Sequence, residues 1–163
     1  MALDSLISDR GLSLISSQFN SDGTRVITQN KNQVKLWNAS NGEFIHSFNN
    51  SDRAKSQYEH KDKNQILSAC FSPDGTEILV GCRGVIRLFN AKSGELISKM
   101  KYKPGKGTLP GHSFFNSKGT KIYINYKANR KSDDIINVWD KSSGKLLEEL
   151  NFEFKYLCDL NSL

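Results

Sequence analysis

The sequence predicts an all-β fold made of three copies of one four-stranded antiparallel unit. A turn motif occurs three times, and each copy is followed at a nearly fixed distance by an apolar run that ends in an aromatic residue. The turns are FNSDGT at 19–24, FSPDGT at 71–76 and FNSKGT at 115–120. The runs are VKLW at 34–37, IRLF at 86–89 and INVW at 136–139. Self-similarity with a period of about 40–50 residues is typical of repeat architectures.

The second copy shows how the four strands arise. Its first run is apolar throughout, as in a strand that is buried on both faces. In the turn that follows, Pro73 presets φ, Asp74 bonds to nearby backbone and Gly75 accepts the left-handed conformation. Short runs rich in β-branched and apolar residues then alternate with tight turns. The predicted strands of this copy are 66–71, 77–81, 85–89 and 95–100.

The other two copies follow the same plan. The first aligns without gaps from Phe19 to Phe48, and the third carries six extra residues between its second and third strands. The strands predicted for these copies are 13–19, 25–29, 33–37, 43–48, 111–115, 121–126, 134–139 and 145–150. The three units therefore cover 13–48, 66–100 and 108–150, and the first strand of a fourth unit is predicted at 154–161. No segment longer than ten residues has a helical period, so almost no helix is expected.

Composition indicates a single domain with an ordinary core. The chain has 163 residues, of which 37% are hydrophobic and 25% charged, and such values are typical of a soluble globular protein. No apolar stretch approaches the ~18 residues of a membrane span, and the N-terminus lacks the pattern of a secretory signal. The three cysteines have no C-x-x-C spacing, which favours buried thiols over a disulfide framework or a zinc site. We expect a cytoplasmic protein.

The turn and the runs after it resemble the repeats of the WD-repeat β-propeller family. The resemblance rests on F-S-P-D-G-T, then I-R-L-F or V-K-L-W, then N-A-x-S/N-G-E-x-I, and it covers about 13–160 of the chain. It implies that each four-stranded unit is one blade and that the blades pack radially around a central channel. It also implies a non-catalytic scaffold for protein–protein interaction.

The copies depart from the family pattern in ways that affect stability. The Trp-Asp dipeptide typical of the family occurs only at Trp139-Asp140. The family's aspartate six residues before the closing aromatic residue is present only in the third copy, as Asp133. The Gly-His pair that opens a family repeat is absent in register, because Gly111-His112 falls inside a first strand. We therefore expect stability to rest on apolar packing between blades. The structural anchors are predicted to be Gly23, Trp37, Gly75, Phe89, Gly119, Asp133 and Trp139.

Three blades do not complete a ring, because propellers close with about 4–8 blades. Three explanations stay open. The chain is a fragment of a longer propeller, or copies of it associate through exposed blade faces, or an open three-blade unit docks on a partner protein. In each case the uncovered blade faces and strand edge are places where another protein can pack.

Positive charge gathers in one stretch of this chain, which has a formal net charge of +6. From Leu96 to Ser132 there are nine basic residues and no acidic one. Loops after the second and fourth strands of a meander emerge on one side, so six basic side chains are predicted to converge on a rim: Lys101, Lys103, Lys106, Lys127, Arg130 and Lys131. Such a rim suits an acidic protein, nucleic acid or an anionic membrane surface. The predominance of lysine over arginine favours an ordinary solvated surface instead.

No motif in the sequence indicates catalysis. The histidines His46, His60 and His112 lack the spacing of metal ligands, and neither a nucleophile motif nor a phosphate-binding loop occurs. We therefore predict no enzyme activity, no metal and no cofactor. The first hypothesis is a protein-interaction module, and the alternative is a basic-rim binder of nucleic acid or anionic membrane.

Overall fold

The computed structural model describes residues 14–49, 65–82, 84–102, 109–127 and 133–153. These residues form twelve strands, and the described part of the chain contains no helix, so it also contains none that could cross a membrane. The strands are β1 Ser16–Phe19, β2 Arg25–Gln29, β3 Gln33–Asn38, β4 Phe44–Asn49, β5 Ile66–Phe71, β6 Glu77–Cys82, β7 Val85–Asn90, β8 Leu96–Lys101, β9 Leu109–Phe115, β10 Lys121–Lys127, β11 Asp133–Asp140 and β12 Leu146–Glu153.

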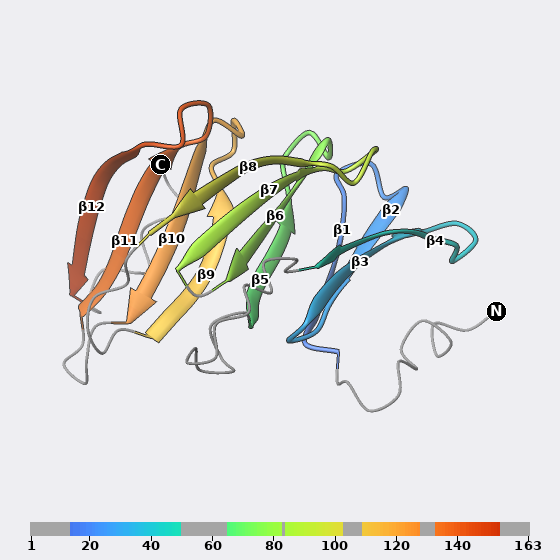
Figure 1. The fold of residues 1–163 in the computed structure, drawn as a ribbon, viewed down its shortest axis with the longest axis horizontal. Helices are drawn as coiled ribbons and strands as arrows, with labels where there is room; N and C mark the ends of the chain where they lie inside the picture. Colours follow the sequence, from blue (N-terminus) through green and yellow to red (C-terminus); the bar gives the residue numbers. More distant parts are fainter. Residues whose placement is uncertain (1–13, 50–64, 83, 103–108, 128–132, 154–163) are drawn as a thin grey trace, which may run out of the picture.

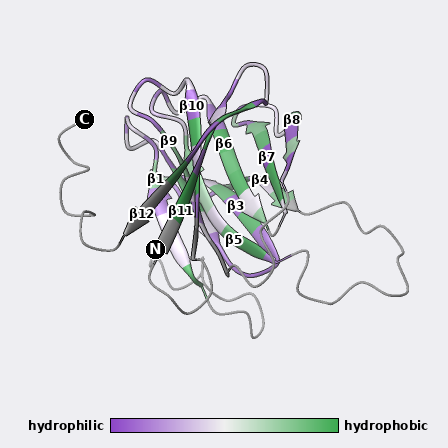
Figure 2. Ribbon diagram, turned by 90° about the vertical axis from the view of Figure 1, so that its left-hand side faces the viewer, coloured by the Kyte–Doolittle hydropathy of each residue, from purple (hydrophilic) through white to green (hydrophobic). Residues whose placement is uncertain are grey.

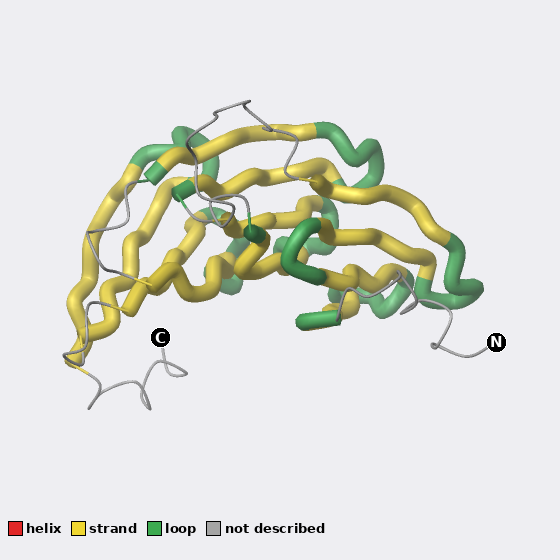
Figure 3. The backbone as a smooth tube through the Cα atoms, turned by 60° about the horizontal axis from the view of Figure 1, so that its bottom comes forward, coloured by secondary structure: helices red, strands yellow, loops and turns green. Residues whose placement is uncertain are grey.

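The strands form three antiparallel meanders, which we call the first blade (β1–β4), the second blade (β5–β8) and the third blade (β9–β12). Within each blade the strands pair in chain order. The inner strand β5 lies beside both other inner strands, β1 and β9, and the blades fan out from this line in one arc (Figures 1 and 3). Radial packing of four-stranded sheets is the arrangement expected of propeller blades.

The predicted strands agree with those observed. The second strand of the first copy, predicted at 25–29, is Arg25–Gln29, and all twelve predicted strands have an observed counterpart. The first strand begins at Ser16 instead of 13, and the last continues to Glu153. The predicted start of a fourth unit at 154–161 lies outside the described residues.

The repeated turn is stabilised by its own polar side chains. Asp22 Oδ1 accepts a hydrogen bond from the backbone N–H of Thr24 at 2.8 Å, and Asp74 does the same for Thr76 at 3.1 Å. The third copy has lysine in place of this aspartate, and Asn116 Oδ1 accepts the N–H of Thr120 at 2.8 Å instead. The turn glycines Gly23, Gly75 and Gly119 have φ values of 72°, 71° and 66°, a region that residues with a Cβ rarely adopt.

The hydrophobic core lies between the blades. The cluster between the first and second blades includes Ile27, Leu36, Phe48, Ile78, Val80 and Phe89. The cluster between the second and third blades includes Leu79, Leu88, Met100, Ile122, Ile124 and Trp139. Side chains of β6 alternate between the two clusters, and Figure 2 shows hydrophobic residues along β6 and β10. The second blade is thus buried on both faces, and the other two are each covered by it on one face.

Candidate functional site

A hollow of about 330 Å³ opens where the three inner strands end at the repeated turns. Each blade contributes equivalent positions to its wall, which include Phe19, Phe71 and Phe115 at the strand ends and Ser21, Pro73 and Ser117 in the turns. Phe114, one residue before Phe115, also lines it. Phe71 is only 7% exposed, whereas Phe19 is 60% exposed and Phe114 is 42% exposed. The hollow therefore has two accessible phenyl rings at its edges and small polar side chains between them.

The inner strands around the hollow are joined by polar contacts. Gln18 Oε1 accepts the backbone N–H of Phe71 at 3.1 Å, which links the first blade to the second. Ser68 and Ser113 share a buried hydrogen bond of 2.7 Å between their hydroxyls, which links the second blade to the third. Burial raises the pKa of the Cys70 thiol to about 12, so this cysteine is protonated and is a poor nucleophile.

The carboxylates of the turns are held in structural hydrogen bonds. The Ser72 hydroxyl, with the N–H of Thr76, lowers the pKa of Asp74. The hydroxyls of Ser142 and Ser143 lower the pKa of Asp140 to about 2. Because these hydrogen bonds favour the ionised form, both carboxyl groups stay ionised near neutral pH and are poorly suited to acid–base catalysis there.

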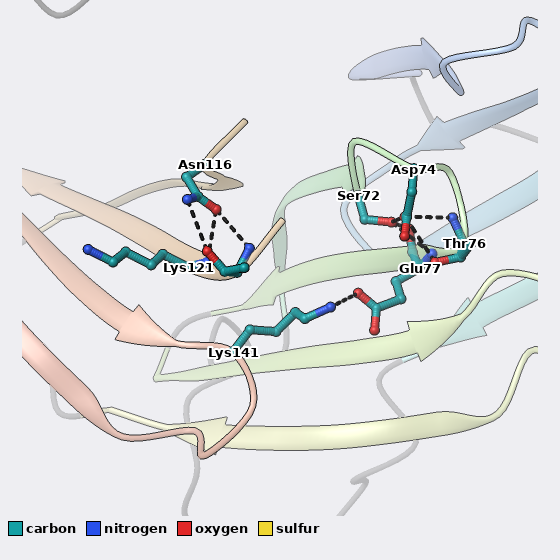
Figure 4. Close-up of polar contacts among 8 residues, drawn as sticks. Ser72, Asp74, Thr76, Glu77, Asn116, Lys121 and Lys141 are labelled. Carbon is teal, nitrogen blue, oxygen red and sulfur yellow. Dashed lines mark hydrogen bonds and ion pairs between the residues drawn. The ribbon is translucent and has the colours of Figure 1, made fainter. Parts of the chain in front are cut away.

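One ion pair connects the turns of neighbouring blades. Lys141 Nζ lies 2.7 Å from Glu77 Oε2, with the two side chains 27% and 16% exposed (Figure 4). Glu77 begins β6 in the second blade, and Lys141 directly follows β11 in the third. In the described ranges, no three His, Cys, Asp or Glu side chains come together as a group that could hold a metal ion.

The predicted basic rim is described only at two positions. Lys101 is the exposed last residue of β8, and Lys127 is the last residue of β10, opposite Asp134 and Leu109. Both strands end at the edge of their blade opposite the repeated turns, as the meander predicts. The other four positions, Lys103, Lys106, Arg130 and Lys131, lie outside the described residues, so their convergence stays a prediction.

The predicted aromatic anchors differ in their surroundings. Phe89 and Trp139 are each 8% exposed and pack between blades. Trp37 is half-buried on the face of the first blade that no other described blade covers. Asp133 is the first residue of β11 and pairs with Glu153 in register.

The sequence did not single out the hollow, although its repeat contained a usable signal. The residues that line it stand at the end of each inner strand and in the first positions of each turn. Inner strands converge in a propeller, so residues at this repeat position in the three copies are brought together. A second hollow of about 560 Å³ lies beside the turns of the first blade, with Arg25, Ala39 and Ile45 among its lining residues. It involves only one copy of the turn.

Comparison with known proteins supports the fold. No protein-family model matches the sequence, and no curated protein matches it. Among solved structures, the chain is similar to the β-propeller domain of Cps50 (Swd1) from Myceliophteria thermophila, with a TM-score of 0.63 and 15% sequence identity. The match covers 88% of this chain and 44% of that one, so the chain spans less than half the length of that domain. The predicted all-β, propeller-type fold is confirmed by this similarity and by the three four-stranded sheets.

Proposed function

We propose that this chain is a non-catalytic protein-interaction or scaffold module of WD-repeat type, located in the cytoplasm. The observation that carries the proposal is the hollow at the turn ends, where Phe19 and Phe114 are exposed beside a cavity formed by all three blades. Exposed apolar side chains around a concavity are typical of surfaces that bind other proteins. The turn carboxylates, by contrast, are occupied in stabilising the turns.

The chemistry of the hollow suits a short segment of a partner protein. An apolar side chain of the partner would fill the space between the phenyl rings. The hydroxyls of Ser21 and Ser117, both in exposed turns, would hydrogen-bond to the partner's backbone. Aromatic rings with adaptable hydroxyl groups between them are a common combination at binding surfaces.

Selection from a random-peptide display library on the whole chain tests this proposal. Peptides should be enriched, and Ser21→Arg or Ser117→Arg, which fill the hollow with a long charged side chain, should weaken their binding at least tenfold. Ser47→Arg is the matched control, because Ser47 is an exposed serine on the outer strand β4. The proposal is wrong if no peptide is enriched, or if the control and the hollow variants behave alike.

The non-catalytic part of the proposal has its own test. If the purified chain turned over a substrate, and a change of one polar residue abolished that turnover without unfolding the protein, the module would be an enzyme. Screening against hydrolase and transferase substrates, with a folded variant for each polar group near the hollow, would reveal this.

The second candidate function is binding of nucleic acid or an anionic membrane surface by the basic rim. It is favoured by the nine basic residues, without an acidic one, between Leu96 and Ser132. Affinity for a polyanion falls steeply with salt, since bound counterions are released. Titration of single-stranded DNA and of phosphatidylserine vesicles should therefore show salt-dependent binding, and Lys127→Glu/Arg130→Glu/Lys131→Glu should abolish it. Binding that is absent, or that does not change with salt, would exclude this function.

A further inference from the structure

The two joints between blades in this chain use the same repeat positions. In the first joint, Phe48 of β4 packs on Phe89 of β7 with ring centroids 5.1 Å apart. In the second joint, Met100 of β8 and Trp139 of β11 belong to one buried cluster. The copies align so that Phe48 and Met100 occupy one repeat position, and Phe89 and Trp139 another. One face of each blade is therefore built to receive the opposite face of the next.

The polar contacts across the joints also share their positions. In the first joint, Arg25 Nη1 donates to the carbonyl oxygen of Ala91 at 3.1 Å. In the second joint, Glu77, which aligns with Arg25, pairs with Lys141, which aligns with Ala91. The turn glycines follow the same rule. A Cβ on Gly75 would lie 3.6 Å from Ser21 Oγ of the preceding blade, and one on Gly119 would lie 3.3 Å from Cδ of Pro73, which aligns with Ser21.

The first blade presents the receiving half of this joint, and no other described blade covers it. Lys35 Nζ of the same blade lies 5.6 Å from the ring centroid of Trp37 on this face. Phe19 is 60% exposed, whereas the aligned Phe71 is buried in the first joint. Trp37 and Val26 are half-buried, whereas the aligned Phe89 and Ile78 are buried. A Cβ on Gly23 would meet no atom within 4 Å.

The third blade presents the complementary half. Tyr123 aligns with the fully buried Leu79 but is only half-buried, and Phe114 stacks on it at 5.4 Å with the rings 5° apart. Val138, opposite Tyr123 on β11, is only 3% exposed and lies beneath this surface. Lys121 aligns with Arg25 and could donate to the backbone carbonyl of Ala39, which aligns with Ala91. This pairing would repeat the Arg25–Ala91 contact of the first joint.

We infer that the outer face of the first blade binds the outer face of the third blade of a second copy of this chain. The joint is heterologous, so it must close into a ring or continue as an open filament. The described blades of two copies number six, and rings of about 4–8 blades close. The structure thus assigns a closed two-copy ring with two identical joints. This inference rests on the blade faces. It shares Phe19 and Phe114 with the edges of the hollow, so its test uses residues of these faces that do not line the hollow.

Molar mass in solution, measured by light scattering across a concentration series, tests the ring. Wild type should reach twice the 18.4 kDa of one chain. Trp37→Glu, or Val26→Glu on the same face, should remove one half of each joint, and Tyr123→Glu should remove the other. Each variant should then be a folded monomer by circular dichroism. Leu96→Glu is the control, because Leu96 is 51% exposed on the second blade and lies outside both clusters.

Mixing the variants distinguishes head-to-tail association from other modes. The third-blade face is unchanged in Trp37→Glu, and the first-blade face is unchanged in Tyr123→Glu. A mixture of the two variants should therefore form a one-to-one dimer through these two faces, although neither variant associates alone. A monomeric wild type, open-ended growth beyond two copies, or a mixture that stays monomeric would each overturn the inference. A monomer that still binds peptides in the hollow would overturn the ring and leave the proposed function standing.

Discussion

Trp37 donates its indole N–H to the hydroxyl of Thr28 at 2.8 Å, and the third blade repeats the tryptophan without the acceptor. Trp139 is 8% exposed, and its buried Nε1 has no hydrogen-bond partner in the structure as described. Ile124 occupies the repeat position of Thr28, which explains the missing bond. The second blade has Phe89 at this repeat position, and a phenyl ring has no N–H that needs a hydrogen-bond acceptor.

Replacement of Ile124 by threonine should therefore supply an acceptor to Trp139. The substitution removes buried apolar atoms, which destabilises the fold, but the new hydrogen bond offsets about 1 kcal/mol of that loss. A double-mutant cycle of Ile124→Thr with Trp139→Phe, measured by urea unfolding, should give a coupling free energy of about this size. Ile122→Thr is the control on the same strand. If both threonines cost the same and show no coupling to Trp139, the unpaired indole N–H has no energetic consequence.

The repeat made the strands predictable, but not the partners of the blade faces. Tight turns at Gly23, Gly75 and Gly119 and apolar runs between them are local signals, so the strand positions could be inferred from the sequence. Which aromatic residue is covered depends on whether another of the described blades lies against it. Trp37 and Phe89 therefore look equivalent in sequence and differ in burial. The hollow also escaped prediction, because it is formed by three strand ends that are distant along the chain.

Gly81 should be intolerant of any side chain. Its strand position puts a Cβ 2.5 Å from Ser113 Oγ and 2.6 Å from Ser68 Oγ, within the buried contact between β5 and β9. Gly81→Ala should lower the free energy of unfolding by about 1–3 kcal/mol, as expected for overpacking. The loss should be smaller when Ser68→Ala and Ser113→Ala are already present. Equal losses in both backgrounds, by denaturant unfolding, would show that the clash is not with these hydroxyls.

The turn after β11 should make stability depend on pH in the acid range. Asp140 accepts hydrogen bonds from Ser142 Oγ at 2.7 Å and from the N–H of Ser143 at 2.8 Å, and its pKa is lowered from 3.8 to about 2. Because the pKa of Asp140 is lower in the folded state, its ionised carboxylate stabilises the fold. This stabilisation is complete above pH 4 and is lost as pH falls through about 2.

Asp140→Asn is the matched variant, because the first two copies have asparagine at this position. Asn38 and Asn90 accept equivalent backbone hydrogen bonds at 2.8–2.9 Å. The variant should form the same turn, but its stability should no longer depend on the ionisation of residue 140. Its melting temperature should therefore fall less than that of wild type between pH 4 and pH 2. Parallel curves would mean that Asp140 is not ionised preferentially in the folded state.

The ion pair between Glu77 and Lys141 should contribute modestly to the joint between the second and third blades. Both side chains are partly exposed, so the pair is screened by water and should be worth about 0.5–1 kcal/mol. Lys141→Ala restores the residue type of the first two copies, and Glu77→Gln removes the other charge. The coupling free energy of these changes should fall in 1 M NaCl, where the Debye length is about 3 Å.

A charge swap, Glu77→Lys with Lys141→Glu, should recover much of the stability lost in either single reversal. If the swap recovers none of it, the two residues act through apolar packing of their stems and not through their charges.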